Sequence, residues 1–310
     1  MTGPTATTPA PPPVGVGDIV THLRGLGMIE ALIGVPGAAA PIGAVATDTQ
    51  AGPGDLAWSR RPGAATHFHG SLLICAPEAA EPDAQAAGEP DLQAAAESGE
   101  PTAVESGEQT SARVVVVCRR PRLAMALVLG RYFAHLAADR PAVYADAATA
   151  LAVDDGRAWV KNAVAGHNVR IEPLATIGCS GMGYERDERD RLVPFPQLGG
   201  VVLEDDVHVA AQAMIQRGAI GDTVVRRGAK IGPHVNVGHN ADVGQDCLIA
   251  GHAQIGGGVR LGSRAVVWQS AAIANGVTVG DDAVIGMGAM IRADVGQGET
   301  WVGNPGRRLS

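Results

Sequence analysis

Several features that define common classes of protein are missing from this 310-residue sequence. No apolar run is long enough to cross a membrane, and the start, MTGPTATTPAPPP, has neither the basic end nor the apolar stretch of a signal peptide. There are only four cysteines, and they share no metal-binding or disulfide spacing: Cys75, Cys118, Cys179 and Cys247. We therefore expect buried free thiols in a reducing compartment and a soluble, cytoplasmic protein.

A basic patch is also missing, and this argues against nucleic acid as a partner. The net charge is −8, but nine of the acidic residues lie between Glu78 and Glu108, where there is no Lys or Arg. Without those nine carboxylates the remainder is near +1. Residues 77–112 are acidic and of low complexity, so we expect a flexible insertion. Residues 1–14 are rich in Pro, Thr and Ala and are predicted to be a disordered tail.

What the sequence does have is a repeat with a period of six. The repeat positions hold a large aliphatic residue at every step: Val225, Ile231, Val237, Val243, Ile249, Ile255, Leu261, Val267, Ile273, Val279, Ile285 and Ile291. A small or β-branched residue precedes each of them by two positions, and glycine most often follows. This period fits neither an α-helix nor an alternating strand, and it indicates a repeat architecture.

Three six-residue strands make one triangular coil of about 18 residues, and successive coils stack at about 4.8 Å. We expect the aliphatic side chain to point inward, the small residue to fill the corner, and glycine to permit the turn. The sequence therefore predicts a mainly β fold, with a left-handed parallel β-helix over residues 141–310. Such hexads resemble those of the hexapeptide-repeat acyltransferases, a resemblance that implies a homotrimer with active sites between neighbouring prisms.

Residues 15–140 are predicted to form a small α/β substrate-binding domain that the acidic insertion interrupts. Asp18 is a candidate cap for a short helix, residues 71–75 and 114–117 read as strands, and a helix is expected from Pro121 to about Leu136. Within the β-helix, a polar segment leaves the prism between Gly183 and Arg191, and a loop protrudes before Val225.

An ordered set of motifs outside the hexads resembles the UDP-3-O-acylglucosamine N-acyltransferases of lipid A biosynthesis. The motifs are GPGDL followed by Trp58, VCRRPRLA, CSGMGYE, PFPQLG, IQRGAIGDTVV and VNVGHNADVG, between Val16 and Gly303. The resemblance implies an N-terminal domain that holds a uridine nucleotide. It also implies a trimeric β-helix that transfers a hydroxyacyl group from acyl carrier protein to the sugar amine.

The chemistry of such a transfer needs a base for the amine and a donor for the oxyanion. His239 matches the family's catalytic histidine, although a merely exposed histidine is the alternative, and Asn240 matches the residue beside it. One coil after His239 comes Gly257, whose N–H we expect about 5 Å along the axis as the oxyanion donor. His234 and His252 are 18 residues apart and should stack, either lining the acyl groove or forming a plain polar edge.

Several positions depart from the family pattern. The nucleotide-binding Asn-Pro-Lys-Tyr is replaced by residues 61–64, Arg-Pro-Gly-Ala, although Trp58 still offers a stacking surface. The family's Asp-Asn pair upstream of the histidine is replaced by Gly232 and Pro233. The second active-site histidine falls near Asn275, an amide that hydrogen-bonds but cannot act as an acid.

The segment WVGNPGRRLS resembles the ending of hexapeptide acetyltransferases that use coenzyme A, so that Arg307, with Arg308 beside it, could meet the phosphates of that donor. We therefore expect acyl-CoA or an acyl-pantetheine carrier protein as co-substrate, with no permanently bound cofactor and no metal site.

The sequence predicts an N-acyltransferase that acts on a small-molecule amine or an amino sugar nucleotide, with His239 as general base. Two alternatives remain open. One is a non-catalytic β-helix that binds a sugar nucleotide or serves as a scaffold, and the other is an O-acetyltransferase that keeps the same base.

Overall fold

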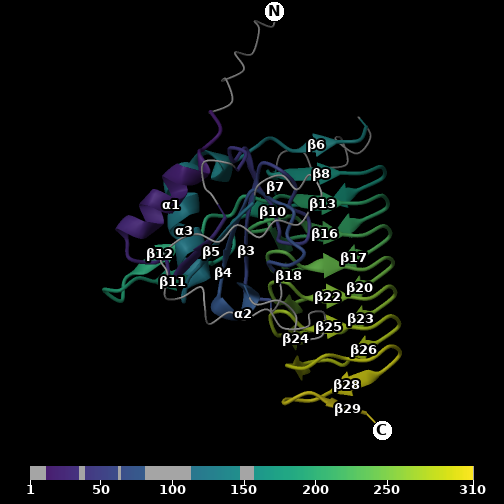
Figure 1. The fold of residues 1–310 in the computed structure, drawn as a ribbon. Helices are drawn as coiled ribbons and strands as arrows, with labels where there is room; N and C mark the ends of the chain where they lie inside the picture. Colours follow the sequence, from purple (N-terminus) through teal and green to yellow (C-terminus); the bar gives the residue numbers. More distant parts are fainter. Residues whose placement is uncertain (1–11, 35–38, 62–63, 81–112, 147–156, 310) are drawn as a thin grey trace, which may run out of the picture. The chain divides into compact units, whose positions relative to one another are not determined.

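The computed structural model describes residues 12–34, 39–61, 64–80, 113–146 and 157–309, drawn in colour in Figure 1. The described chain forms two compact units. The first holds residues up to Phe133 together with Tyr184–Phe195, and the second holds Ala134–Gly183 and Pro196–Ser310. Two predicted segments lie largely outside the described residues: residues 1–11 of the tail and residues 81–112 of the insertion.

The first unit is built on one mixed sheet. Its strands are, in spatial order, β1 (Ala31–Ile33), β5 (Val114–Val117), β4 (Leu72–Cys75), β3 (Asp55–Ser59) and β2 (Ala44–Val45). The central strands β4 and β5 are parallel and buried throughout, which explains why both read as continuous apolar runs. Both predicted strands, 71–75 and 114–117, are thus confirmed to within one residue.

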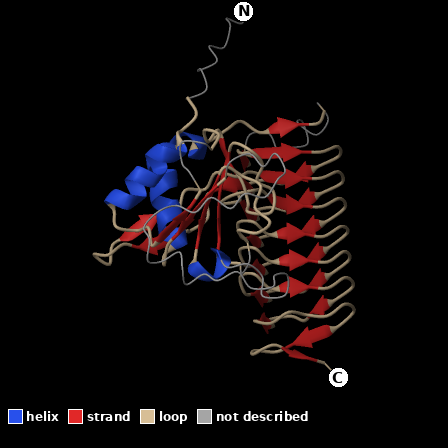
Figure 2. Ribbon diagram, viewed as in Figure 1, coloured by secondary structure: helices blue, strands red, loops and turns tan. Residues whose placement is uncertain are grey.

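Within the described part of this unit, three α-helices accompany the sheet: α1 (Val16–Gly25), α2 (Pro77–Ala80) and α3 (Pro121–Tyr132). Helix α3 packs against strands β3 and β4, and α1 lies beside α3 (Figures 1 and 2). The prediction that Asp18 caps α1 is wrong, because the helix begins at Val16 with Gly15 at its N-cap position. Asp18 instead lies in the first turn, where a carboxylate is favourable because of the helix dipole. Helix α3 ends at Tyr132, and a 3₁₀ turn follows at Ala134–Ala137.

A hairpin from the middle of the β-helix sequence belongs to the first unit. Its strands β11 (Tyr184–Arg186) and β12 (Leu192–Pro194) are antiparallel and contact α3. Glu185 forms a 2.5 Å ion pair with Arg122 of α3. The polar segment that the sequence predicts to leave the prism is therefore held by the N-terminal unit.

The second unit is a parallel β-helix with three faces, whose strands stack one above the other (Figure 1). The first face contains β6 (Val143–Tyr144), β8 (Ala163–Ala165), β13 (Val201–Leu203), β16 (Thr223–Val225), β19 (Asp242–Val243), β22 (Arg260–Leu261) and β25 (Thr278–Val279). The second face contains β9 (Arg170–Ile171), β14 (His208–Val209), β17 (Lys230–Ile231), β20 (Leu248–Ile249), β23 (Val266–Val267), β26 (Val284–Ile285), β28 (Thr300–Val302) and β29 (Arg307–Arg308). The third face contains β7 (Trp159–Val160), β10 (Thr176–Cys179), β15 (Met214–Gln216), β18 (Asn236–Val237), β21 (Gln254–Ile255), β24 (Ala272–Ile273) and β27 (Met290–Ile291).

The interior of the β-helix is filled by the residues of the six-residue repeat. All twelve repeat aliphatics from Val225 to Ile291 are buried in one continuous core, together with the small residues two positions before them. Ile171, Ile177 and Leu203, which precede the regular repeat in the sequence, belong to the same core. The predicted repeat is confirmed, because a period of six places each aliphatic on the inner side of consecutive faces.

The corners correct the predicted role of glycine. The residue three positions after the inward aliphatic takes a positive φ, and it is often not glycine: His234, Asn240, Asp246 and His252 have φ between 55° and 63°. The N–H of Val235 bonds back to the carbonyl of Gly232 in the same turn. This is the geometry of a type II turn, which places the positive φ at its third residue.

The glycine that directly follows the aliphatic serves close packing. A Cβ on Gly238 would lie 2.6 Å from the nitrogen of Gly257 in the next coil, and a Cβ on Gly262 would lie 2.4 Å from the nitrogen of Asp281. Side chains there would push neighbouring coils apart, so glycine at this position permits the stacking distance rather than the turn.

Three of the four cysteines are buried and Cys179 is half-buried, and all four are free thiols. Burial raises the pKa of Cys75 to about 12 and that of Cys118 to about 11. These thiols are therefore protonated and unreactive at neutral pH. Within the described ranges, no helix has the length and hydrophobicity needed to span a bilayer.

Candidate active site on the β-helix

His239 lies at the corner between the third and first faces, directly after β18, and is half-buried. Its backbone N–H donates to Oε1 of Gln216 at 3.2 Å. Gln216 ends β15, one coil earlier on the same face. The turn that carries the histidine is thus fastened to the preceding coil.

Asn240 fixes the protonation pattern of the His239 ring. Its Nδ2 donates to the carbonyl of Ile220 at 2.8 Å, and its Oδ1 accepts from the N–H of Ala219 at 2.9 Å. These two bonds identify which end of the carboxamide is oxygen. The Nδ1 of His239 lies 3.2 Å from this Oδ1, so it must donate to it. In the neutral ring Nδ1 therefore carries the proton, and Nε2 keeps its lone pair.

The other side of the ring packs on glycines. A Cβ on Gly257 would lie 2.7 Å from Nε2 of His239, and a Cβ on Gly181 would lie 3.1 Å from Cδ2. The ring therefore occupies space that is open only because both residues lack side chains. The N–H of Gly258 donates to the carbonyl of His239 at 2.8 Å, which confirms that Gly257 stands one coil above the histidine.

The backbone N–H of Gly257, predicted as the oxyanion donor, has a partner in this structure. It donates to Oδ1 of Asn275 at 2.9 Å. Asn275 occupies the same corner one further coil along, after β24, and its side chain is exposed. His239, Gly257 and Asn275 thus form one column parallel to the helix axis, hereafter the corner column.

This column brings together a basic nitrogen, a backbone donor and an amide side chain. Nε2 of His239 is the atom that can accept a proton, and the N–H of Gly257 points to the neighbouring coil position. A proton acceptor beside hydrogen-bond donors is the arrangement that acyl transfer requires.

His234 and His252 stack as predicted. Their rings are nearly parallel, with an interplanar angle of 9° and centroids 4.6 Å apart. Both are exposed, at the corner between the second and third faces. They belong to a different column from His239, so any contact with a substrate there stays a prediction.

The remaining predicted site residues lie elsewhere. Trp58 is half-buried on β3 of the first unit, where its ring is 6.3 Å from that of Phe195. Phe195 in turn lies 5.4 Å from the guanidinium of Arg122. Of the segment 61–64, Pro62 and Gly63 fall outside the described residues. Arg307 is exposed on β29, and its Nη1 donates to the carbonyl of Gly306 at 3.0 Å.

Sequence reasoning missed three residues of this site: Gly181, Gln216 and Thr223. Gly181 and Gln216 contact His239, and the buried Oγ1 of Thr223 accepts the N–H of Asn240 at 2.8 Å. All three flank the irregular segments that interrupt the hexads. Their only signal is that the motifs CSGMGYE and IQRGAIGDTVV do not follow the repeat.

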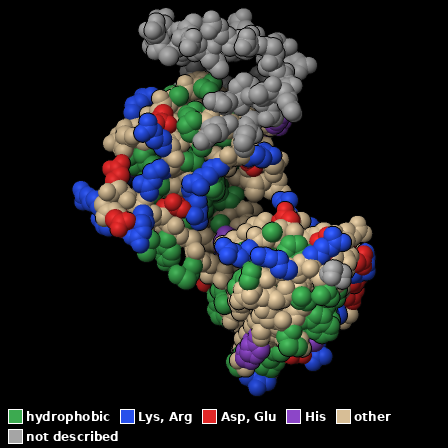
Figure 3. All heavy atoms as spheres, turned by 90° about the horizontal axis from the view of Figure 1, so that it is seen from below, with side chains coloured by type: hydrophobic (Ala, Val, Ile, Leu, Met, Phe, Trp, Pro, Cys, Tyr) green, Lys and Arg blue, Asp and Glu red, His purple; other side chains and the backbone are tan. Residues whose placement is uncertain are grey.

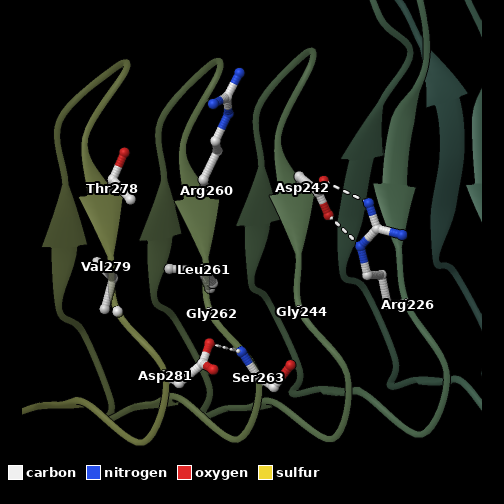
Figure 4. Close-up of a pocket in the computed structure, with 11 residues that line it drawn as sticks. Arg226, Asp242, Gly244, Arg260, Leu261, Gly262, Ser263, Thr278, Val279 and Asp281 are labelled. Carbon is white, nitrogen blue, oxygen red and sulfur yellow. Dashed lines mark hydrogen bonds and ion pairs between the residues drawn. The ribbon is translucent and has the colours of Figure 1, made fainter. Parts of the chain in front are cut away.

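A groove of about 280 Å³ lies away from the corner column, on the first face and the corner that follows it (Figure 4). Both oxygens of Asp242 are bound by Arg226, at 2.8 and 2.7 Å, and Asp281 accepts the N–H of Ser263 at 2.8 Å. None of the predicted site residues lines this groove. Across the described ranges, no three His, Cys, Asp or Glu residues are grouped so that they could hold a metal ion.

Comparison with known proteins supports the resemblance over part of the chain. The UDP-3-O-acylglucosamine N-acyltransferase of Francisella tularensis subsp. holarctica is 43% identical over 77 residues, which are 25% of this chain and 23% of that protein. The enzyme of the same name from Coxiella burnetii is 43% identical over 81 residues, 26% of this chain and 24% of that protein. No family model matches the chain.

Solved structures of similar proteins include the UDP-N-acetylglucosamine acyltransferase from Campylobacter jejuni. It is 20% identical, with a TM-score of 0.41, and the alignment covers 55% of this chain and 72% of that one.

The repeat and the fold define a hexapeptide-repeat β-helix, and the partial sequence match is to acyltransferases that carry such repeats. Over the matched quarter the chain is similar to the UDP-3-O-acylglucosamine N-acyltransferases. The match spans about a quarter of the length of those relatives, so their substrates and partners do not carry over with the fold.

Proposed function

We propose that the protein is an N-acyltransferase that moves an acyl group from a pantetheine thioester to the amine of a small molecule or an amino sugar nucleotide. The observation that carries the proposal is the hydrogen bond from Nδ1 of His239 to Asn240, which leaves Nε2 as the basic nitrogen. The donor is acyl-CoA or an acyl carrier protein, and both present the same thioester.

In the proposed reaction the amine nitrogen attacks the thioester carbonyl carbon, and the C–N bond forms as the carbonyl π electrons move to oxygen. Nε2 of His239 takes the proton from the nitrogen. The tetrahedral intermediate then collapses, the C–S bond breaks, and the leaving sulfur receives the proton from His239. The products are an amide and a free thiol. Donors toward the oxyanion stabilise the intermediate.

Thiol release provides the test. The purified protein is offered acetyl-CoA, succinyl-CoA and a hydroxyacyl carrier protein, each with a panel of amines that includes UDP-glucosamine derivatives. His239→Ala should lower turnover about 10²- to 10⁴-fold, because a positioned general base contributes about that factor. His167→Ala, at an exposed histidine paired with Asp146, is the matched control and should keep full activity.

Two outcomes would contradict the proposal. Unchanged turnover in His239→Ala would show that His239 is not the general base. No turnover by the wild-type protein with any donor and acceptor of the panel would favour a binding or scaffold role. Alcohol acceptors in the same panel address O-acylation, since the same base would serve a hydroxyl group.

A further inference from the structure

The side chain of Asn275 accepts a hydrogen bond from the backbone N–H of Gly257, which is the proposed oxyanion donor. Its Oδ1 accepts the N–H of Gly257 at 2.9 Å. A backbone amide has a single hydrogen, so this N–H cannot give a full hydrogen bond to a thioester oxygen while Asn275 holds it. Acyl transfer at His239 therefore requires the carboxamide of Asn275 to move.

The amino group of the same carboxamide is available to donate hydrogen bonds. Among the described residues, its Nδ2 donates no hydrogen bond, and the side chain is exposed at the outer edge of the corner column. Because the Asn275 side chain is exposed, its carboxamide has room on the solvent side to change rotamer.

We propose that Asn275 is a switch on the oxyanion site: its Oδ1 caps the Gly257 N–H, and on thioester binding its carboxamide turns so that Gly257 N–H and Asn275 Nδ2 both donate to the carbonyl oxygen. This inference rests on the proposed function and adds a substrate-contacting residue to it. Where the resemblance predicts a second histidine, this chain would use a neutral amide that needs no particular pH.

A plain structural role makes the opposite prediction for one substitution. If Asn275 only caps the turn of Gly257, a carboxylate does so at least as well, because it also accepts a backbone N–H. If Asn275 is the switch, the carboxylate of Asn275→Asp holds the N–H more strongly, has no hydrogen to donate, and repels the developing oxyanion.

The experiment compares Asn275→Ala with Asn275→Asp in the full-length protein, measuring kcat and KM for the thioester. Removing one oxyanion donor typically costs about 10²- to 10³-fold in kcat. We expect Asn275→Asp to fall by that factor and Asn275→Ala to retain at least tenfold more activity, with a lower KM because no cap must be displaced. An Asn275→Asp protein as active as Asn275→Ala, or more active, would overturn the switch.

Gln245→Ala and Gln245→Asp are the matched controls. Gln245 holds the equivalent turn position at the next corner, and its Nε2 donates to Asp246 there, away from His239. Both variants should turn over like the wild type. Unequal melting temperatures of the two Asn275 variants would be corrected by assaying well below the lower one.

A spectroscopic reading separates this inference from the proposed function. In protein labelled with ¹⁵N-glycine, the Gly257 amide signal should move when a non-transferable thioester isostere of acetyl-CoA is added, and should stay in place in Asn275→Asp. Wild-type turnover with no movement of this signal would overturn the switch alone. No turnover and no binding of the isostere would overturn both proposals.

Discussion

At the scale of single residues, the site depends on the neighbour of the histidine as much as on the histidine. Asn240 bonds to three carbonyl and amide groups of the 219–221 segment and also to the His239 ring. A free histidine would distribute its proton over both nitrogens. Here the carboxamide selects one tautomer, because its own orientation is fixed from outside.

Replacing Asn240 with alanine should therefore lower kcat about 10- to 100-fold, while leaving the thioester KM less affected, because a share of the rings adopts the wrong tautomer. The ¹⁵N signals of the His239 ring should show the loss of the Nδ1–H form. Asn168→Ala is the control, since Asn168 also has a positive φ, 54°, and donates to Asp206. Unchanged ring signals in Asn240→Ala would refute the positioning role.

A second prediction at the residue scale concerns the stability of the folded state at low pH. The hydrogen bond from His208, then the N–H of Ala211 and the charge of Arg170, hold the pKa of Glu172 below its ordinary value of 4.5. A lowered carboxyl pKa stabilises the folded state above 4.5, and this contribution disappears as the pH falls through the lowered value. Glu172→Gln should thus flatten the acid limb of a stability curve measured by urea unfolding. An equally steep limb in the variant would show that Glu172 contributes nothing.

At the scale of the element, the corner is the unit that the fold repeats. Most corners hold one residue with positive φ and, at many coils, one glycine in close contact with the coil above. These two requirements are separate. The first concerns backbone torsion and is met by glycine or by other residues, most often Asn, Asp or His, and the second concerns space and is met by glycine.

Ser270 offers a direct test of the torsional requirement, because it is exposed and has a φ of 59°. Ser270→Val should destabilise the β-helix by about 1–2 kcal/mol, since a β-branched residue is strained at positive φ. Ser270→Gly should be neutral or slightly stabilising. The free energy of unfolding in guanidinium measures both, and equal values for the two variants would contradict the corner rule.

The parts of the fold that follow the repeat could be read from the sequence. The 18-residue spacing placed Gly257 above His239 and stacked His234 on His252, because coil geometry alone decides these contacts. The spacing could not reveal Gln216 or the hairpin at Tyr184–Phe195, because these depend on segments of irregular length. Nor could it reveal the bond from Gly257 to Asn275, which depends on a side-chain rotamer.

At the scale of the whole molecule, the surface of the β-helix carries large apolar side chains. Leu248, Trp268 and Met287 are 42%, 40% and 70% exposed. Hydrophobic side chains reach the surface on the face seen in Figure 3, beside charges of both signs. Such residues suit an interface between copies of the chain.

We expect a homotrimer, with about three times the 31.5 kDa mass of the chain in light scattering. Trp268→Glu should shift the mass toward the monomer if this residue is covered in the assembly, because burying an unpaired charge is costly. Arg264→Glu, which breaks an exposed ion pair with Asp282, is a control for the change of charge. A wild-type monomer would contradict the predicted assembly.

The corner column also constrains how the gene can change in length. Val237 pairs with Ile255, 18 residues on, so adding or deleting one whole coil leaves every later residue at its own corner. An insertion of six residues between His239 and Gly257 would rotate everything after it by one face and separate the histidine from its partners. Extra residues are otherwise tolerated only where they loop outward, as they do between Ile215 and its partner Val237. In any lineage that keeps the site, duplications or deletions in the β-helix are therefore expected to span whole coils.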